Sequence, residues 1–248
     1  MILDDLFREF ESRYKFVNNF STGIILDYSC SSLMSYHGAK ILLKNNFSKV
    51  YHHNILDDVD DFSCRIMEKN HVCFNQLKFN PENSFFDCIF SSETIYREKN
   101  PMETISKFYD LLKDDGILVI TSFNKDALNF IYERSRISYD LFSKDDFLKI
   151  LGTKFSKIDL YSQILVNGQK PIKRFKMTTL LKSKLRFYLG FLYSKIDKKG
   201  NFYTKYLLRS LKTQNNVLDV VLDKKPYTPI LHNEEHFPKF FIAVCHKK

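Results

Sequence analysis

The sequence predicts an α/β protein built on a doubly wound, mostly parallel sheet of seven strands. Three observations predict this class. Short apolar runs alternate along the chain with segments whose apolar residues recur at helical spacing. One run, Phe85 to Ser91, is apolar almost throughout, which is typical of a central parallel strand covered on both faces. A second such run, Phe240 to Cys245, predicts a terminal strand of the same sheet.

The first half of the chain is expected to hold an N-terminal helix and then alternating strands and helices. The apolar runs predict strands at Gly23–Tyr28, Lys49–His53, His71–Phe74 and Phe85–Ser91. Helical spacing predicts helices between them, at residues 38–47 and 55–69. Helices in these positions would serve as the crossovers that parallel strands require.

Capping residues mark the helices of the second half. Asn100 and the proline after it predict a helix start, because asparagine caps a first turn and proline is tolerated there. Residues 114–116, Asp-Asp-Gly, predict a turn into a strand at residues 117–121. Ser143 and the two acids that follow predict a second helix start, and residues 155–163 predict the next strand.

The composition excludes several classes of protein. The chain has 248 residues, a net charge of +9 and only 7 glycines, so it is not collagen-like, glycine-linked or disordered. No apolar run approaches the roughly 20 residues of a membrane span, and the N-terminus has no signal-peptide core. Five scattered cysteines without a C-x-x-C pair predict free buried thiols in a reducing compartment, and hence a cytoplasmic location.

The strand order indicates where a ligand would bind. In doubly wound sheets, ligands bind beyond the carboxyl ends of the strands, near the point where the strand order reverses. The segments expected at that edge are residues 27–38, 52–57, 75–77 and 91–97.

One stretch carries a resemblance to a known family. Phe85 to Ile95, followed by Asn100-Pro101, Leu111 to Ile120 and Asn124, resembles class I S-adenosylmethionine-dependent methyltransferases in order and spacing. The resemblance covers about residues 22–163 and the last strand. It implies a Rossmann-like fold with S-adenosylmethionine as cofactor and S-adenosylhomocysteine as product. Residues 143–163 also resemble members found in polysaccharide and sugar-modification pathways.

The resemblance implies a cofactor site with a divergent loop. The acid of the family's first motif is kept as Asp27, but its three glycine positions hold Ser29, Ser31 and Leu33. The loop before the next helix, which begins at Gly38, is about three residues longer than in the family. The residues implied around the cofactor are Asp27, Ser29, Ser31, Gly38, Asn54 at the ribose position, Asn75 and Gln76 at the adenine position, and Ser91.

The catalytic candidates follow the strand ends. Glu93 matches the family's acid after the fourth strand, and Arg97 stands where the family commonly has the second residue of a Glu-His pair. His37 lies in the expected loop before Gly38. We expect these three residues near the reacting centre.

No metal site is expected. Residues 232–236, His-Asn-Glu-Glu-His, match a zinc-protease motif that requires a helix. Pro229 and Pro238 flank the motif closely, so a long helix is not expected there.

The domain organisation predicted is a core at residues 1–165, an insertion or lid at 166–236 and a final core strand at 237–248. Thirteen basic residues against one acidic residue lie between Lys170 and Lys212, interleaved with aromatic residues, so this helical insertion carries +12. Three interpretations remain open. The segment is a lid or homodimer interface, it binds an anionic acceptor or a membrane surface, or it binds nucleic acid. No RNA-binding motif supports the last.

Two hypotheses for function follow. In the first, the chain is a methyltransferase that acts on an oxygen of a small or carbohydrate-type acceptor. In the second, it is a degenerate methyltransferase-fold protein that binds cofactor weakly or not at all and acts as a binding or assembly partner. The missing glycines and Asn54 are the features that separate the two.

Overall fold

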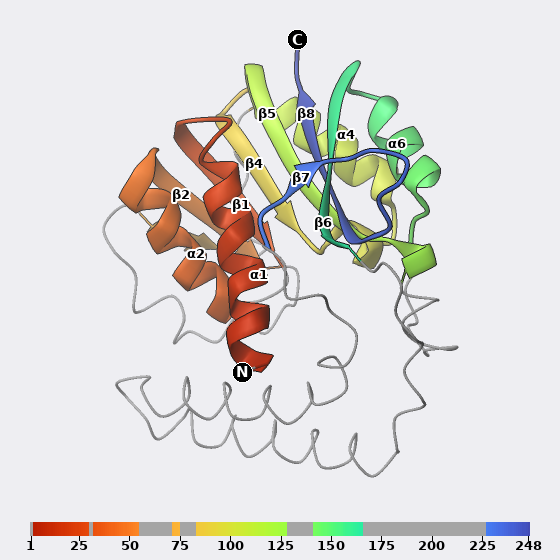
Figure 1. Cartoon of the computed structure of the whole chain (residues 1–248). Helices are drawn as coiled ribbons and strands as arrows, with labels where there is room; N and C mark the ends of the chain where they lie inside the picture. Colours follow the sequence, from red (N-terminus) through yellow and green to blue (C-terminus); the bar gives the residue numbers. More distant parts are fainter. Residues whose placement is uncertain (1, 30–31, 55–70, 75–82, 128–140, 166–226) are drawn as a thin grey trace.

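The computed structural model describes residues 2–29, 32–54, 71–74, 83–127, 141–165 and 227–248. These residues form an open eight-stranded sheet with the order β3-β2-β1-β4-β5-β8-β6-β7 (Figure 1). The five strands from β3 to β5 run parallel, and β8 is antiparallel to both of its neighbours. The predicted doubly wound, mostly parallel sheet is therefore confirmed.

The strands have the following bounds: β1 Gly23–Ser29, β2 Phe47–Asn54, β3 His71–Phe74, β4 Phe86–Ser92, β5 Leu112–Phe123, β6 Lys157–Leu165, β7 Ile230–Leu231 and β8 Pro238–His246. The helices are α1 Ile2–Val17, α2 Ser32–Asn45, the short 3-10 helix η1 Ile95–Arg97, α4 Pro101–Leu111 and α6 Lys144–Gly152.

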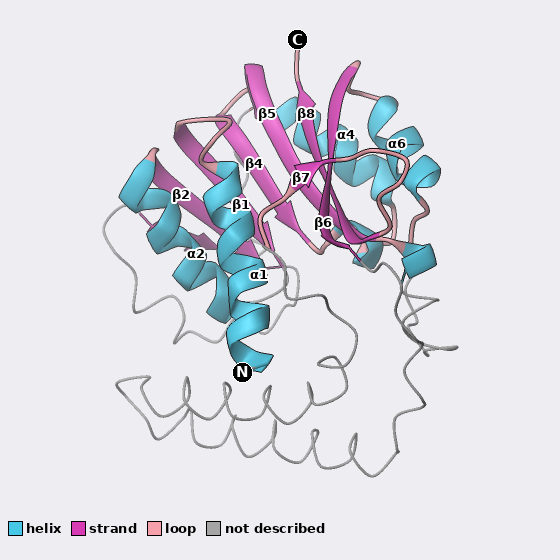
Figure 2. Ribbon diagram, in the orientation of Figure 1, coloured by secondary structure: helices cyan, strands magenta, loops and turns pink. Residues whose placement is uncertain are grey.

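Helices cover both faces of the sheet (Figure 2). On one face, Tyr14 and Val17 of α1 and Leu42 of α2 pack with Ile25 and Phe90 of the sheet in one buried cluster. On the other face, α4 and α6 bury a second cluster, which includes Phe108 and Phe147. The central strands are thus apolar on both sides, which is why β4 is an almost continuous apolar run.

Both predicted helix caps are present. The Asn100 side chain accepts a hydrogen bond from the backbone N–H of Glu103, and the Ser143 side chain accepts one from Asp146. Each cap satisfies a backbone donor that the first turn leaves without an intrahelical partner. These bonds fix the starts of α4 and α6 where the sequence predicts them.

Three elements differ from expectation. Helix α2 begins at Ser32 rather than at Gly38, so the residues expected in a long loop are helical. Residues 114–116, which were expected to form a turn, lie within β5. The register between β4 and β5 shifts at this point, and Asp115 has a φ of 62°. The two-residue strand β7 pairs with β6 at residues expected to belong to the insertion. The expected helix at residues 55–69 and the basic segment lie outside the described residues.

Two further expectations concern the thiols and membrane spans. Cys88 and Cys245 are buried free thiols, as predicted, and burial raises the pKa of each. Among the described helices, none is long and apolar enough to cross a bilayer.

Candidate active site

The carboxyl ends of three neighbouring strands bring two predicted cofactor residues, Ser29 and Asn54, together with Ser92, which was not predicted. Ser29 at the end of β1 is paired in register with Asn54 of β2 and with Ser92 of β4. Asp27 lies two residues before Ser29 and is completely buried. Because side chains alternate along a strand, Asp27, Ser29 and Ser92 share the face that α1 and α2 cover.

Asp27 has one oxygen engaged and one without a partner. Its Oδ2 accepts a hydrogen bond of 2.9 Å from the Tyr14 hydroxyl and lies 3.6 Å from Nδ1 of His52. Its Oδ1 is buried and has no hydrogen-bond partner among the described residues. A buried carboxylate oxygen without a partner costs free energy, so this atom fits a ligand that donates a hydrogen bond.

Ser92 presents a second buried acceptor of the same kind. Its Oγ has no partner in the described part of the chain, and the residue is 1% exposed. By contrast, Ser91 points to the opposite face, where its hydroxyl lies 2.5 Å from that of Thr94. Asp27 and Ser92 thus each keep a buried oxygen open to a ligand's hydrogen bond, whereas Ser91 is already satisfied within the protein.

Glu93, the first catalytic candidate, has a strained backbone directly after β4. Its φ of 55° lies in the left-handed region, where a residue with a side chain costs about 1–3 kcal/mol. The neighbouring structure holds this conformation. The backbone N–H of Glu93 donates to the Thr121 hydroxyl at 2.9 Å, and its carbonyl accepts from Nε of Arg97 at 3.2 Å. Strain that is held in this way is typical of functional sites.

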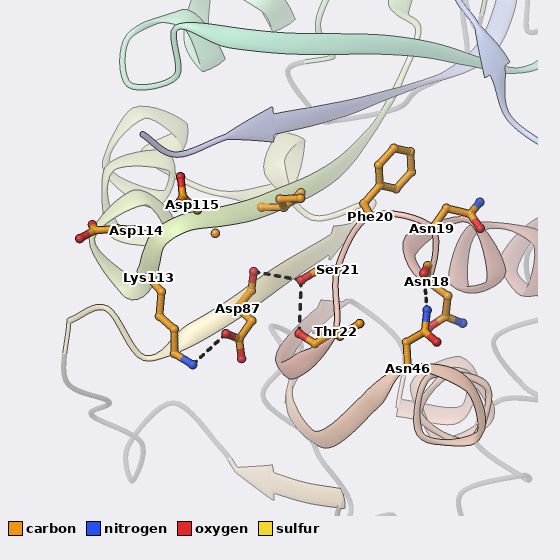
Figure 3. Close-up of a pocket in the computed structure, with 12 residues that line it drawn as sticks. Asn18, Asn19, Phe20, Ser21, Thr22, Asn46, Asp87, Lys113, Asp114 and Asp115 are labelled. Carbon is orange, nitrogen blue, oxygen red and sulfur yellow. Dashed lines mark hydrogen bonds and ion pairs between the residues drawn. The ribbon is translucent and has the colours of Figure 1, made fainter.

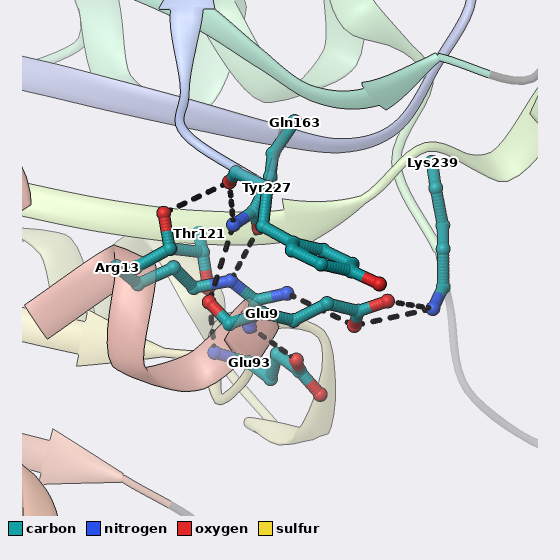
Figure 4. A network of polar contacts seen from close by, with 8 residues as sticks. Glu9, Arg13, Glu93, Thr121, Gln163, Tyr227 and Lys239 are labelled. Atoms are coloured by element: carbon teal, nitrogen blue, oxygen red, sulfur yellow. Dashed lines mark hydrogen bonds and ion pairs between the residues drawn. The ribbon is translucent and has the colours of Figure 1, made fainter. Parts of the chain in front are cut away.

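The Glu93 carboxylate is part of a buried network of charges (Figure 4). Arg13 of α1 donates from Nη1 to Oε1 of Glu93, and from Nε to the Gln163 side chain at 2.6 Å. Lys239 of β8 bonds both carboxylate oxygens of Glu9, at 3.1 and 3.3 Å. Two acids and two bases therefore balance in a region almost closed to solvent.

Sequence reasoning missed most of this network. Arg13 and Glu93 are 80 residues apart, and Gln163 contacts Arg13 across 150 residues. Contacts over such separations leave no local pattern in the sequence. The amphipathic character of α1 is a local signal that could have indicated its packing on the sheet.

The remaining catalytic candidates are placed as follows. Arg97 ends η1, bonds the backbone of Glu93 and lies over the ring of Tyr96 at 5.3 Å. His37, expected in a loop, is instead in helix α2. The structure therefore places Arg97 beside Glu93, where it bonds the backbone carbonyl of Glu93 and not its carboxylate.

Gly38 is also in α2, where it makes close packing possible. A Cβ atom at this position would lie 2.1 Å from Cζ of Tyr14. The glycine thus lets α1 approach α2 and hold Tyr14 over Asp27, while its contact with cofactor stays a prediction. Ser31, Asn75 and Gln76 lie outside the described residues.

A polar cavity of about 530 Å³ lies at the opposite edge of the sheet (Figure 3). It is lined by residues that precede β1, among them Asn18 and Thr22, and by residues in the first parts of β4 and β5, among them Asp87 and Asp114. Asp87 is engaged there, because it accepts from Lys113 at 2.8 Å. Doubly wound folds bind their ligands at the carboxyl edge, so this cavity is not the predicted cofactor site.

The zinc-protease motif forms no helix. His232 follows β7 and contacts the Ser162 hydroxyl through Nδ1 at 2.7 Å. Within the described residues, no group of three or more histidine, cysteine or acidic side chains is arranged to hold a metal ion.

Comparisons with known proteins address the family directly. Residues 7–159 match the model of a methyltransferase domain family. A search of curated proteins finds no match.

Solved structures share the fold at low sequence identity. A SAM-dependent methyltransferase from Thermotoga maritima, described as a possible histamine N-methyltransferase, has a TM-score of 0.55 at 10% identity, over 99% of this chain and 94% of its own. A SAM-dependent methyltransferase from Archaeoglobus fulgidus has a TM-score of 0.53 at 10% identity, with 96% and 92% covered. The [4+2]-cyclase SpnF has a TM-score of 0.52 at 12% identity, with 96% and 81% covered.

The sequence match and the shared fold agree. The family model covers more than half of the chain, including most of α1, the five parallel strands and Glu93. S-adenosylmethionine is the cofactor of such enzymes. The chain belongs to the methyltransferase domain family and is a class I S-adenosylmethionine-dependent methyltransferase.

Proposed function

We propose that the chain methylates a hydroxyl oxygen of a small or carbohydrate-type acceptor at the carboxyl edge of β1 and β4. The observation that carries this proposal is Glu93, an acidic residue whose backbone is held in a strained conformation directly beyond β4. A hydroxyl is a weak nucleophile, so its methylation gains from a nearby group that accepts the proton. Glu93 is suited to that task.

The proposed mechanism assigns a role to each described residue. S-adenosylmethionine, when bound, supplies a methyl group on a positively charged sulfur. Asp27 and Ser92 hold the cofactor through their unpartnered oxygens. Glu93 receives the acceptor proton on Oε2, because Arg13 already bonds Oε1. Much of the rate acceleration then comes from alignment of the two reactants.

The basic segment extends the proposal to the acceptor and its surroundings. Its charge of +12 favours an anionic acceptor, such as a phosphorylated or lipid-linked glycan, and peripheral contact with a membrane. Its aromatic residues favour a lid over the acceptor or a homodimer interface. Free buried thiols at Cys88 and Cys245 favour the cytoplasm as the place of reaction.

Transfer of labelled methyl groups tests the proposed acceptor class. The full chain would be incubated with methyl-labelled S-adenosylmethionine and matched panels of sugars, phosphorylated sugars and amines. We expect label on hydroxyl oxygens, and we expect Glu93→Gln to lower kcat about 100-fold or more. Asp110→Asn, an exposed change on α4, is the matched control and leaves kcat unchanged.

Two results would overturn parts of this proposal. Label found only on amines would exclude O-methylation, and an unchanged kcat in Glu93→Gln would exclude the assigned base. Failure of the wild-type chain to bind S-adenosylmethionine would instead favour the degenerate, non-catalytic alternative.

A further inference from the structure

Arg13 is the buried cation that joins α1 to the reacting edge of the sheet. It is 1% exposed, although it belongs to the N-terminal helix and carries a full charge. A cation is buried in this way only where partners compensate its lost hydration. Its principal partner is the carboxylate of Glu93.

Several elements fix the guanidinium group in place. Gln163 of β6 accepts from Nε at 2.6 Å, and the ring of Phe240 in β8 lies 4.0 Å from Cζ. Gln163 is itself held, since its amide donates to the carbonyls of Glu9 and Tyr227. The planar guanidinium therefore has one orientation, which it imposes on the carboxylate that it bonds.

Glu93 is held at three separate points. Thr121 holds its backbone nitrogen, Arg97 holds its carbonyl oxygen, and Arg13 holds its carboxylate. The first two contacts fix the backbone of Glu93 but leave its side chain able to rotate. The direction of the carboxylate depends on Arg13.

We propose that Arg13 is a positioning residue, which directs the Glu93 carboxylate toward the bound cofactor and acceptor. The inference rests on the proposed function, because it assigns Glu93 to the reacting centre. Through Arg13, helix α1 becomes part of the site and does more than cover one face of the sheet. Because the cofactor carries a positive charge on its sulfur, a Glu93 carboxylate directed toward it also strengthens cofactor binding. Loss of Arg13 then misplaces Glu93 and weakens binding even when the oxygens of Asp27 and Ser92 are intact.

The test is a double-mutant cycle on the full chain, with S-adenosylmethionine as the calorimetric probe. We expect Arg13→Met to weaken binding about tenfold and Arg13→Lys to restore part of the loss. In the Glu93→Gln background, Arg13→Met should weaken binding no further, because the carboxylate that it positions is gone. Lys15→Met is the matched control on the same helix, since Lys15 is 63% exposed, and it should bind as the wild type does.

The outcomes separate this inference from the proposed function. Thermal unfolding gives the melting temperature of each variant, and binding is measured well below that temperature, where the variant is folded. Equal affinity of wild type and Arg13→Met, with a lowered melting temperature alone, would reduce Arg13 to a structural role and overturn the inference. Equal losses in the wild-type and Glu93→Gln backgrounds would overturn it too. Absence of binding by the wild-type chain would overturn the proposed function, and the inference with it.

Discussion

At the scale of single residues, the proposed cofactor site depends on a row of contacts from Gly38 through Tyr14 to Asp27. Gly38 leaves room for the ring of Tyr14, the Tyr14 hydroxyl donates to Asp27, and Asp27 keeps a free oxygen. The place of Asp27 near the carboxyl end of β1 could be predicted, because it ends a short apolar run. The contact between Gly38 and Tyr14 does not, because it joins two helices whose docking no local pattern encodes.

The variant Gly38→Ala tests the contact between Gly38 and the Tyr14 ring. The added methyl group would collide with the Tyr14 ring, so we expect the free energy of unfolding to fall by about 1–3 kcal/mol. Chemical denaturation measures the change. Gly152→Ala is the matched control, because a Cβ there meets nothing within 4 Å and alanine favours a helix. Equal stability of Gly38→Ala and the wild type would contradict the packing described.

At the scale of elements, local sequence signals predict where helices begin, whereas contacts between distant residues decide short strands such as β7. The caps at Asn100 and Ser143 identify α4 and α6 from the sequence, since each cap bond closes within three residues. The predicted start of α2 was wrong because the family pattern places a loop there, whereas Leu33, which stands at one of its glycine positions, lies in the helix. Strand β7 has only two residues and leaves no periodic pattern, so only its pairing with β6 reveals it.

His232, which follows β7, makes the stability of the folded chain depend on pH. Burial lowers the pKa of His232 from its ordinary value of 6.5, and the charge of Lys144 lowers it further, while Glu234 acts in the opposite direction. The unfolded chain therefore binds this proton more readily than the folded chain. Stability that is complete above pH 6.5 should decline as the pH falls through and below that value.

Denaturant unfolding at pH 7.5 and at pH 5.5 measures this effect. His232→Asn keeps a polar partner for Ser162 but does not titrate, so its stability should fall less between the two pH values than that of the wild type. The difference corresponds to uptake of at most one proton. An identical pH dependence in both proteins would show that His232 does not contribute.

At the scale of the whole molecule, the strand order decides which residues come to lie together. The sheet and its strand order place Asp27, Ser92 and Glu93 at one edge, and the polar cavity lies at the other. The positive charge belongs to residues 170–212, since the rest of the chain carries −3. The class of fold and the residues at the carboxyl ends of its parallel strands could be predicted, because buried parallel strands and their crossovers repeat along the chain. The buried network of α1 could not, because folding alone brings its residues together.

The most direct test of this account is calorimetric titration of the full chain with S-adenosylmethionine, in the wild type, Asp27→Asn and Asp114→Asn. Asp27→Asn keeps an oxygen that accepts from Tyr14 but loses the charge that strengthens a bond to a cationic donor. We predict that the wild type binds, that Asp27→Asn binds about tenfold more weakly, and that Asp114→Asn, in the cavity at the opposite edge, binds as the wild type does. Unchanged binding by Asp27→Asn together with weakened binding by Asp114→Asn would contradict the placement of the site.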